Sequence, residues 1–292
     1  MALINKDTVS NKMSGRILKN KIAKVIFFIA TIIGLLFLGA LAYRILTQGL
    51  GSLDMDFLTG FTSQSPDRAG IKAGVIGSLW LMSVTAPVTL IIGVATAIYL
   101  EEYAKRGRFT RFIQINLQNL AGVPSIVFGL LGLTIFVYIF KTGEIVLAGG
   151  LTLGLLVLPV IVVAAQESIR SVPNELREAS YGMGATKWQT VRRIVLPAAI
   201  PGILTGGILA LSRAIGETAP LLLVGAATAI FTLPSGIFDP YTAMPIQIYS
   251  WTKAPQPEFE YVASAGIIVL LVILLLLNSI AVFIRNKFSK RL

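Results

Sequence analysis

One arginine and one glutamate lie inside an otherwise apolar stretch of this sequence, Arg213 and Glu217. Their spacing of four residues would place them on one face of a helix. Each charge near the centre of a bilayer costs roughly 2.5–3.5 kcal/mol on insertion scales, so both are expected to face a helix bundle or a cavity. A guanidinium matches the oxygens of a tetraoxyanion, and Glu217 would hold Arg213 in place, with Ser212 and Thr218 adding hydrogen bonds. A self-neutralising structural ion pair is the alternative.

Covalent and metal chemistry have few candidate groups in this chain. It contains no cysteine and no histidine, which removes thiol nucleophiles, zinc–thiolate sites, the usual acid–base group at neutral pH and the commonest metal ligand. No phosphate-binding G-x-x-x-x-G-K-[ST] motif occurs, because residues 182–187 lack the glycine that should precede Lys187. We therefore assign this chain no catalytic residue, no metal site and no cofactor.

The composition indicates a membrane protein. Of 292 residues, 55% are hydrophobic and only 13% are charged, and the mean hydropathy is +0.79. These values exclude a disordered chain, a coiled coil and an ordinary water-soluble enzyme. A bilayer core takes about 20 apolar residues per helix, so we expect an all-α, polytopic fold with about six transmembrane helices. The expected spans are residues 25–47, 73–100, 123–140 (extended backward by a helix from Phe109), 145–165, 201–226 and 261–284.

The basic residues predict how these spans are oriented. Nineteen of the 25 lysines and arginines lie in segments that would share one side of the membrane. The positive-inside rule places that side, and both termini, in the cytoplasm. The segment 40–42 resembles a signal-peptidase site, but the basic leader and apolar run are long for a signal peptide, which favours a retained first span. The expected organisation is a basic tail 1–24, a first span 25–47, a core 73–284 with a cytoplasmic loop 166–199, and a basic tail 285–292.

The cytoplasmic loop 166–199 is predicted to contain two short helices. Pro173 suits the first turn of one helix, which the glycines at 182 and 184 can end. Thr186 and Gln189 form a capping-box pattern for a second helix, which Pro197 is expected to close. The exposed apolar stripe is typical either of helices that lie on anionic lipid or of a knob that docks into a groove on a soluble partner.

This loop resembles the EAA loop of ABC importer permeases. The matching residues are Glu178-Ala179-Ser180, three residues, Gly184, nine residues, then Ile194-Val195-Leu196-Pro197. The one departure is Ser180, where the family pattern has alanine. The resemblance implies a type I ABC importer permease (MetI-like) fold and a separate ATP-binding subunit, which uses ATP and Mg²⁺. It also implies that Glu178, Ala179, Ser180, Gly184, Leu196 and Pro197 couple this chain to that ATPase.

Two further segments, 120–130 and 212–220, resemble the third-span and fifth-span signatures of phosphate importer permeases. The ending Thr218-Ala219-Pro220 is closer to the PstA-type subunit than to its PstC-type paralogue. The resemblance implies ATP-driven alternating access for inorganic phosphate in a prokaryotic inner membrane. The implied partners are a PstC-type permease subunit, two ATP-binding subunits, an extracytoplasmic phosphate-binding protein and membrane lipid, but not nucleic acid.

Two alternative functions stay open. An ABC permease for another oxyanion, such as sulfate, molybdate or phosphonate, fits the same residues. An ion-coupled secondary transporter would need ionisable residues at the midplane and often has an inverted repeat. The sequence offers only the pair Arg213/Glu217 and shows no obvious internal duplication.

Two loops, 48–72 and 227–260, are expected to face outward, and the second contains turn signals and several aromatic residues. They are expected either to dock a solute-binding protein or to form an aromatic belt at the membrane surface. The candidate belt residues are Phe231, Phe238, Tyr241, Tyr249 and Trp251.

Overall fold

The fold is taken from a computed structural model of the chain, which describes residues 6–105, 107–226, 230 and 232–289. Within these ranges every regular element is a helix. Five helices are long and apolar enough to cross a membrane, and a bent helix pair brings the number to six if it counts as one span. The expectation of an all-α protein with about six spans is therefore confirmed. The five are α1 (Lys6–Gly49), α3 (Lys72–Ile98), α6 (Val146–Arg170), α9 (Leu196–Ile215, preceded without a break by residues from Lys187) and α12 (Phe259–Ser289).

Small residues let α3, α6 and α9 approach closely at the centre of the bundle. A Cβ on Gly150 of α6 would lie 2.8 Å from Val84 of α3, and the hydroxyl of Thr85 donates to the Gly150 carbonyl at 2.9 Å. On the α9 side, a Cβ on Gly206 would lie 2.3 Å from Ala164 of α6. Because lipid supplies no hydrophobic force between helices, such close contact is what holds a membrane bundle together.

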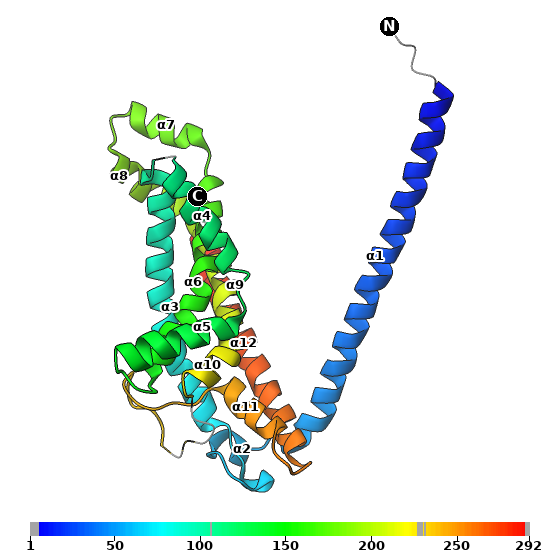
Figure 1. Ribbon diagram of the computed structural model, residues 1–292, viewed down its shortest axis with the longest axis vertical. Helices are drawn as coiled ribbons and strands as arrows, with labels where there is room; N and C mark the ends of the chain where they lie inside the picture. The colour runs from blue at the N-terminus through cyan, green and yellow to red at the C-terminus, as the bar shows by residue number, and fades with distance from the viewer. Residues whose placement is uncertain (1–5, 106, 227–229, 231, 290–292) are drawn as a thin grey trace.

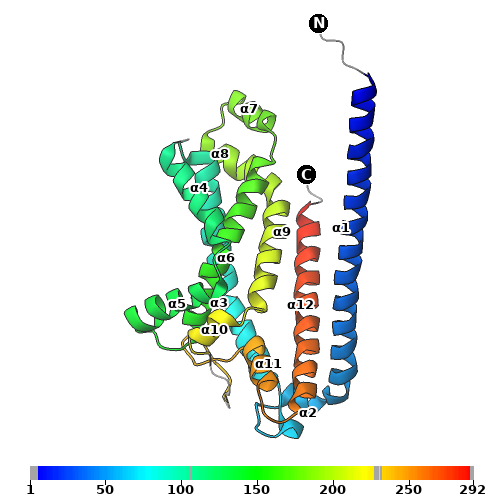
Figure 2. The same cartoon turned by 45° about the vertical axis from the view of Figure 1, so that its right-hand side comes forward.

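Helix α1 stands apart from this bundle along most of its length and meets α12 near the end that carries α2 (Figures 1 and 2). It includes residues 6–24, which were expected as a tail. None of its most apolar window is buried. The apolar surface of α1 is therefore left for lipid or another chain to cover.

The third span is not one helix, which corrects the expectation of a single span 123–140 extended from Phe109. Helix α4 (Arg108–Leu120) ends before Gly122, and α5 (Ser125–Gly132) continues as the π-helical segment η4 (Leu133–Ile139). The two parts meet at 106°. Pro124 explains the bend, because it lacks an N–H group and pushes Val123 out of the helical conformation.

The fifth span also differs from the expected 201–226. Helix α9 starts earlier, at Leu196, and ends at Ile215, with Gly216 as its C-cap. After a break at Glu217, the short helix α10 (Ala219–Leu223) begins with Pro220 in its first turn. A glycine after the last turn, followed by a proline, is a common way to stop a helix.

The segments expected to face outward contain short helices, namely η1 (Leu50–Ser52), α2 (Met55–Thr59), η2 (Pro66–Arg68) and α11 (Met244–Thr252). The candidate residues for an aromatic belt differ in exposure. Phe238 and Tyr249 are exposed, whereas Tyr241 and Trp251 are buried in the core and cannot anchor at the surface. Phe231 lies outside the described residues.

Candidate coupling and translocation sites

The loop between α6 and α9 folds into the two predicted helices. Helix α7 (Asn174–Gly182) ends in a Schellman motif, in which the Gly184 N–H donates to Tyr181 and the Ala185 N–H donates to Ser180. Gly184 has a φ of +80°, a left-handed conformation that favours glycine. The glycine of the EAA pattern is therefore the residue that turns the chain between α7 and α8.

The second helix of the loop starts as predicted but does not stop. Helix α8 (Lys187–Thr190) carries the complete capping box of Thr186 and Gln189. It continues through the π-helical turn η5 (Val191–Val195) directly into α9, so the expectation that Pro197 closes it is wrong. A π turn just before a proline widens the helix where the proline has no N–H to donate, which lets the helix pass Pro197.

The EAA residues divide into exposed and internal ones. Glu178, Ala179 and Gly184 are exposed on α7 and the turn that follows it. Ser180 is buried, and its hydroxyl lies 2.9 Å from that of Thr190 in α8. Ser180 thus holds the two helices of the loop together. Leu196 and Pro197 are half-buried at the start of α9, where Leu196 packs on the core.

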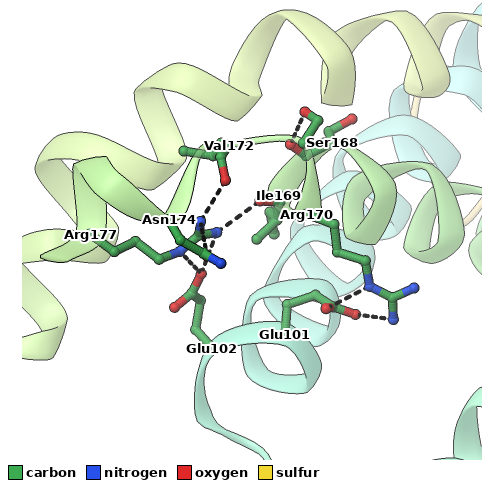
Figure 3. Close-up of polar contacts among 9 residues, drawn as sticks. Glu101, Glu102, Ser168, Ile169, Arg170, Val172, Asn174 and Arg177 are labelled. Atoms are coloured by element: carbon green, nitrogen blue, oxygen red, sulfur yellow. Dashed lines mark hydrogen bonds and ion pairs between the residues drawn. The ribbon is translucent and has the colours of Figure 1, made fainter.

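One ion pair fastens α7 of this loop to the end of α3, and a neighbouring pair ties the end of α6 to the same place (Figure 3). Helix α3 runs into the π-helical turn η3 (Tyr99–Tyr103), which presents two adjacent glutamates. The Arg170 Nη2 lies 2.6 Å from a Glu101 carboxylate oxygen, and the Arg177 Nη2 lies 3.0 Å from one of Glu102. None of these four residues was predicted from the sequence to belong to a site. The sequence did contain a signal for them, because two adjacent acidic residues end a span on the side of the membrane that is otherwise basic. Acidic residues in such a place are expected to pair with arginines.

The pair inside the fifth span is present but lies at a helix end. The Arg213 Nε is 3.1 Å from a Glu217 carboxylate oxygen. Arg213 belongs to the last turn of α9, whereas Glu217 lies beyond the Gly216 cap, so the two do not share a continuous helix. The side chain of Arg213 is 56% exposed and that of Glu217 is 16% exposed. The guanidinium is therefore accessible, and the carboxylate that holds it is largely covered.

The two neighbouring candidates lie in different surroundings. The Ser212 hydroxyl lies within hydrogen-bonding distance of both the Ile208 carbonyl and the side chain of Asn278 in α12, so it joins α9 to α12. Thr218 is half-buried at the start of α10. Of the four predicted pathway residues, the structure thus joins Arg213 and Glu217 to each other, while Ser212 bonds to another helix.

The breaks in the third and fifth spans lie close together. A Cβ on Gly129 of α5 would lie 2.7 Å from the Cα of Pro220 in α10. Val123, in the bend between α4 and α5, packs on a core cluster that includes Ala210 and Ala214, the neighbour of Arg213. Non-helical backbone at membrane depth is tolerated where it is buried in protein or lines a cavity. The exposed Arg213 therefore lies where two interrupted spans meet.

Among the described residues, no group of three or more Asp or Glu side chains is arranged to hold a metal ion.

Comparison with known proteins extends these findings. Residues 89–292 match the family described as "Binding-protein-dependent transport system inner membrane component". The chain is 33% identical to the probable ABC transporter permease protein YqgI of Bacillus subtilis, over 90% of this chain and 93% of that relative. It is 32% identical to the phosphate transport system permease protein PstA of Haemophilus influenzae, over 89% of this chain and 91% of that relative.

A solved structure has the same fold. An inward-facing conformation of the MetNI methionine ABC transporter is similar with a TM-score of 0.62 at 20% sequence identity. The similarity covers 74% of this chain and 94% of the other. The predicted type I importer permease architecture is therefore confirmed.

Proposed function

The chain belongs to the family of inner membrane components of binding-protein-dependent transport systems, and from that premise we propose that it imports inorganic phosphate as a PstA-type permease subunit. It is an ABC importer permease with several membrane-spanning helices. The observation that carries the choice of phosphate is the 32% identity to a phosphate transport system permease over 89% of the chain. The exposed guanidinium of Arg213 fits that substrate, because a planar fork of donors matches phosphate oxygens.

Arg213 would act as a positively charged, short-lived binding site for the anion as it crosses the membrane. Its Nε donates to Glu217 at 3.1 Å, which leaves the two Nη groups of this exposed side chain to donate to the anion. Glu217 also lowers the net positive charge, so the anion would bind weakly enough to leave again, as conduction requires. Thr218 at the break would add a hydroxyl, whereas Ser212, bonded to Asn278, would set the position of α9.

ATP hydrolysis would come from a separate subunit, with ATP and Mg²⁺ bound there. The exposed Glu178, Ala179 and Gly184 would form the surface that docks into that subunit. Closure of the ATPase dimer would move α7. This movement would tilt the third to fifth spans, so that the pathway opens to the other side of the membrane, giving alternating access. This arrangement puts α7 and both chain termini in the cytoplasm, in agreement with the positive-inside rule.

The proposed assembly contains this chain, a PstC-type permease subunit, two ATP-binding subunits and an extracytoplasmic phosphate-binding protein. The exposed apolar face of α1 is available for lipid or for the second permease subunit. Substrate selection would rest mainly with the binding protein, since Arg213 alone does not distinguish one oxyanion from another.

The test is reconstitution of this assembly into lipid vesicles. The measurements are ATP hydrolysis and uptake with phosphate in the binding protein, and the control is sulfate. We expect phosphate to stimulate both hydrolysis and uptake, and sulfate to stimulate neither. Coupling to sulfate, molybdate or phosphonate instead would keep the permease and replace its substrate. Uptake by this chain alone, driven by an ion gradient, would contradict the proposal and favour a secondary transporter.

A further inference from the structure

The contact between Arg177 and Glu102 joins the coupling helix α7 to the end of α3 (Figure 3). The Nε and Nη2 of Arg177 lie 3.1 and 3.0 Å from the same carboxylate oxygen of Glu102. The two side chains are only 14% and 8% exposed. Water therefore weakens this pair much less than it weakens an ion pair on the surface.

Arg177 also stabilises the joint between α6 and α7, which is residues 171–173. Helix α6 ends at Arg170 and α7 begins at Asn174, so a short non-helical segment connects them. The Nη2 of Arg177 donates to the Ile169 carbonyl at 2.9 Å, and its Nη1 donates to the Val172 carbonyl at 2.6 Å. A single guanidinium thus bonds to α6, to the joint itself and to the end of α3. Only arginine offers enough donors in one rigid plane to do this.

The neighbouring pair provides a natural comparison. Arg170 donates to both carboxylate oxygens of Glu101, at 2.7 and 2.6 Å, and Gln166 donates to the same carboxylate. This cluster ties α6 to the end of α3, as the other pair does, but the Arg170 side chain is 53% exposed and its bonds do not reach α7. The two pairs lie side by side and differ in whether the coupling helix takes part.

We infer that the Arg177–Glu102 bond is the rigid link through which movement of α7 reaches α3 and α6. This inference rests on the proposed function of the chain as an ATP-driven permease. Without the link, a displacement of α7 would be absorbed by rotation at the joint 171–173. With the link, α7 and the ends of both spans move as one body, so the pathway follows the ATPase. Arg177 is a positioning residue in this scheme and contacts neither nucleotide nor phosphate.

The test compares variants in the complete reconstituted importer, and the readout is the amount of phosphate taken up per ATP hydrolysed. We expect Arg177→Gln and Glu102→Gln each to lower this ratio about tenfold, while ATP hydrolysis and co-purification of the ATPase persist. Arg177→Lys keeps the charge but not the fork of donors, so its ratio should lie between that of the unmodified complex and that of Arg177→Gln. The matched control is Arg170→Gln, whose ratio should stay within about twofold of the unmodified complex.

The double variant Glu102→Gln/Arg177→Gln removes both charges and leaves no unpaired charge behind. It serves as the test if a single variant does not assemble, and otherwise it should be no worse than either single variant, because both break one link. An unchanged ratio in Arg177→Gln or in the double variant would overturn the inference. An equal fall in Arg170→Gln would overturn it as well. Failure of the unmodified complex to take up phosphate would instead contradict the proposed function.

Discussion

The molecule contains two arginine–glutamate pairs of similar length that lie in opposite surroundings. Arg177 and Glu102, at the end of the bundle that carries α7, are 14% and 8% exposed, and all three nitrogens of Arg177 donate to protein acceptors. Arg213 is 56% exposed, and the hydrogen bond that the described structure gives it is to Glu217, through Nε. One guanidinium is saturated by the protein, and the other keeps donors available.

Under the proposed function, this difference would separate a structural link from a binding group. A buried arginine with filled donors can transmit force but has nothing to offer an anion. An arginine held at one nitrogen by a largely covered carboxylate is fixed in direction and still able to bind. A family resemblance alone does not separate these roles, since both residues lie in or beside recognisable motifs. Substitutions at the two arginines and in the coupling loop test this separation.

The largest effect is expected from Arg213→Gln. Loss of the charge should reduce phosphate uptake by roughly a hundredfold, as removal of a key donor to an anionic group does elsewhere. Assembly should survive, because the pair is exposed on the arginine side and such pairs contribute only about 0–1 kcal/mol to stability. Uptake into vesicles and co-purification of the partner subunits check the two parts. Wild-type uptake by this variant would make Arg213 purely structural and would remove the contrast with Arg177.

A smaller effect is expected at the turn after α7. Gly184 has a φ of +80° with open space around its Cβ position. Valine there would strain the backbone by about 1–2 kcal/mol, so Gly184→Val should distort the coupling surface and lower uptake about tenfold.

The matched control for this turn is Gly182→Val. Gly182 also has open space around its Cβ position, but it is the last residue of α7 and lacks a positive φ. Its valine variant should keep uptake within about twofold, because surface substitutions without strain have small effects. Equal losses in both variants would show that bulk at this surface, rather than the turn conformation, is what matters.

The sequence predicted the architecture well because hydrophobic length is a strong signal. The span count, the all-α fold, the Gly184 turn and the Thr186 capping box all follow from local rules, and the structure confirms them. Gly150 packs closely against Val84, as small residues at a contact between membrane helices do.

The errors arose where proline and glycine have more than one possible effect. Pro124 bends the third span, whereas the helix continues through Pro197 after a π turn. The residue type alone does not distinguish these two outcomes. Gly216 ends α9 one residue before Glu217, so the four-residue spacing of the central pair did not indicate a continuous helix. The pairing of Glu102 with Arg177 was missed because the two residues are 75 positions apart and only the packing of α3 on α6 brings them together.

The smallest effect is expected from Ser180→Ala, which converts the loop to the alanine of the family pattern. The substitution removes the hydrogen bond to Thr190, worth about 0.5–1.5 kcal/mol. The loss should fall at the lower end of that range, because the Thr190 hydroxyl still donates to the Thr186 carbonyl at 3.2 Å and is not left unpaired. Thermal unfolding of the purified complex should shift slightly, and uptake should stay within about twofold. Thr190→Val removes both bonds and should destabilise the loop more.

If Ser180→Ala instead lowered uptake as strongly as Arg177→Gln while stability stayed unchanged, the buried serine hydroxyl would have to become exposed to the ATPase during transport. The rigid loop inferred from the Arg177 link would then have to open in each cycle.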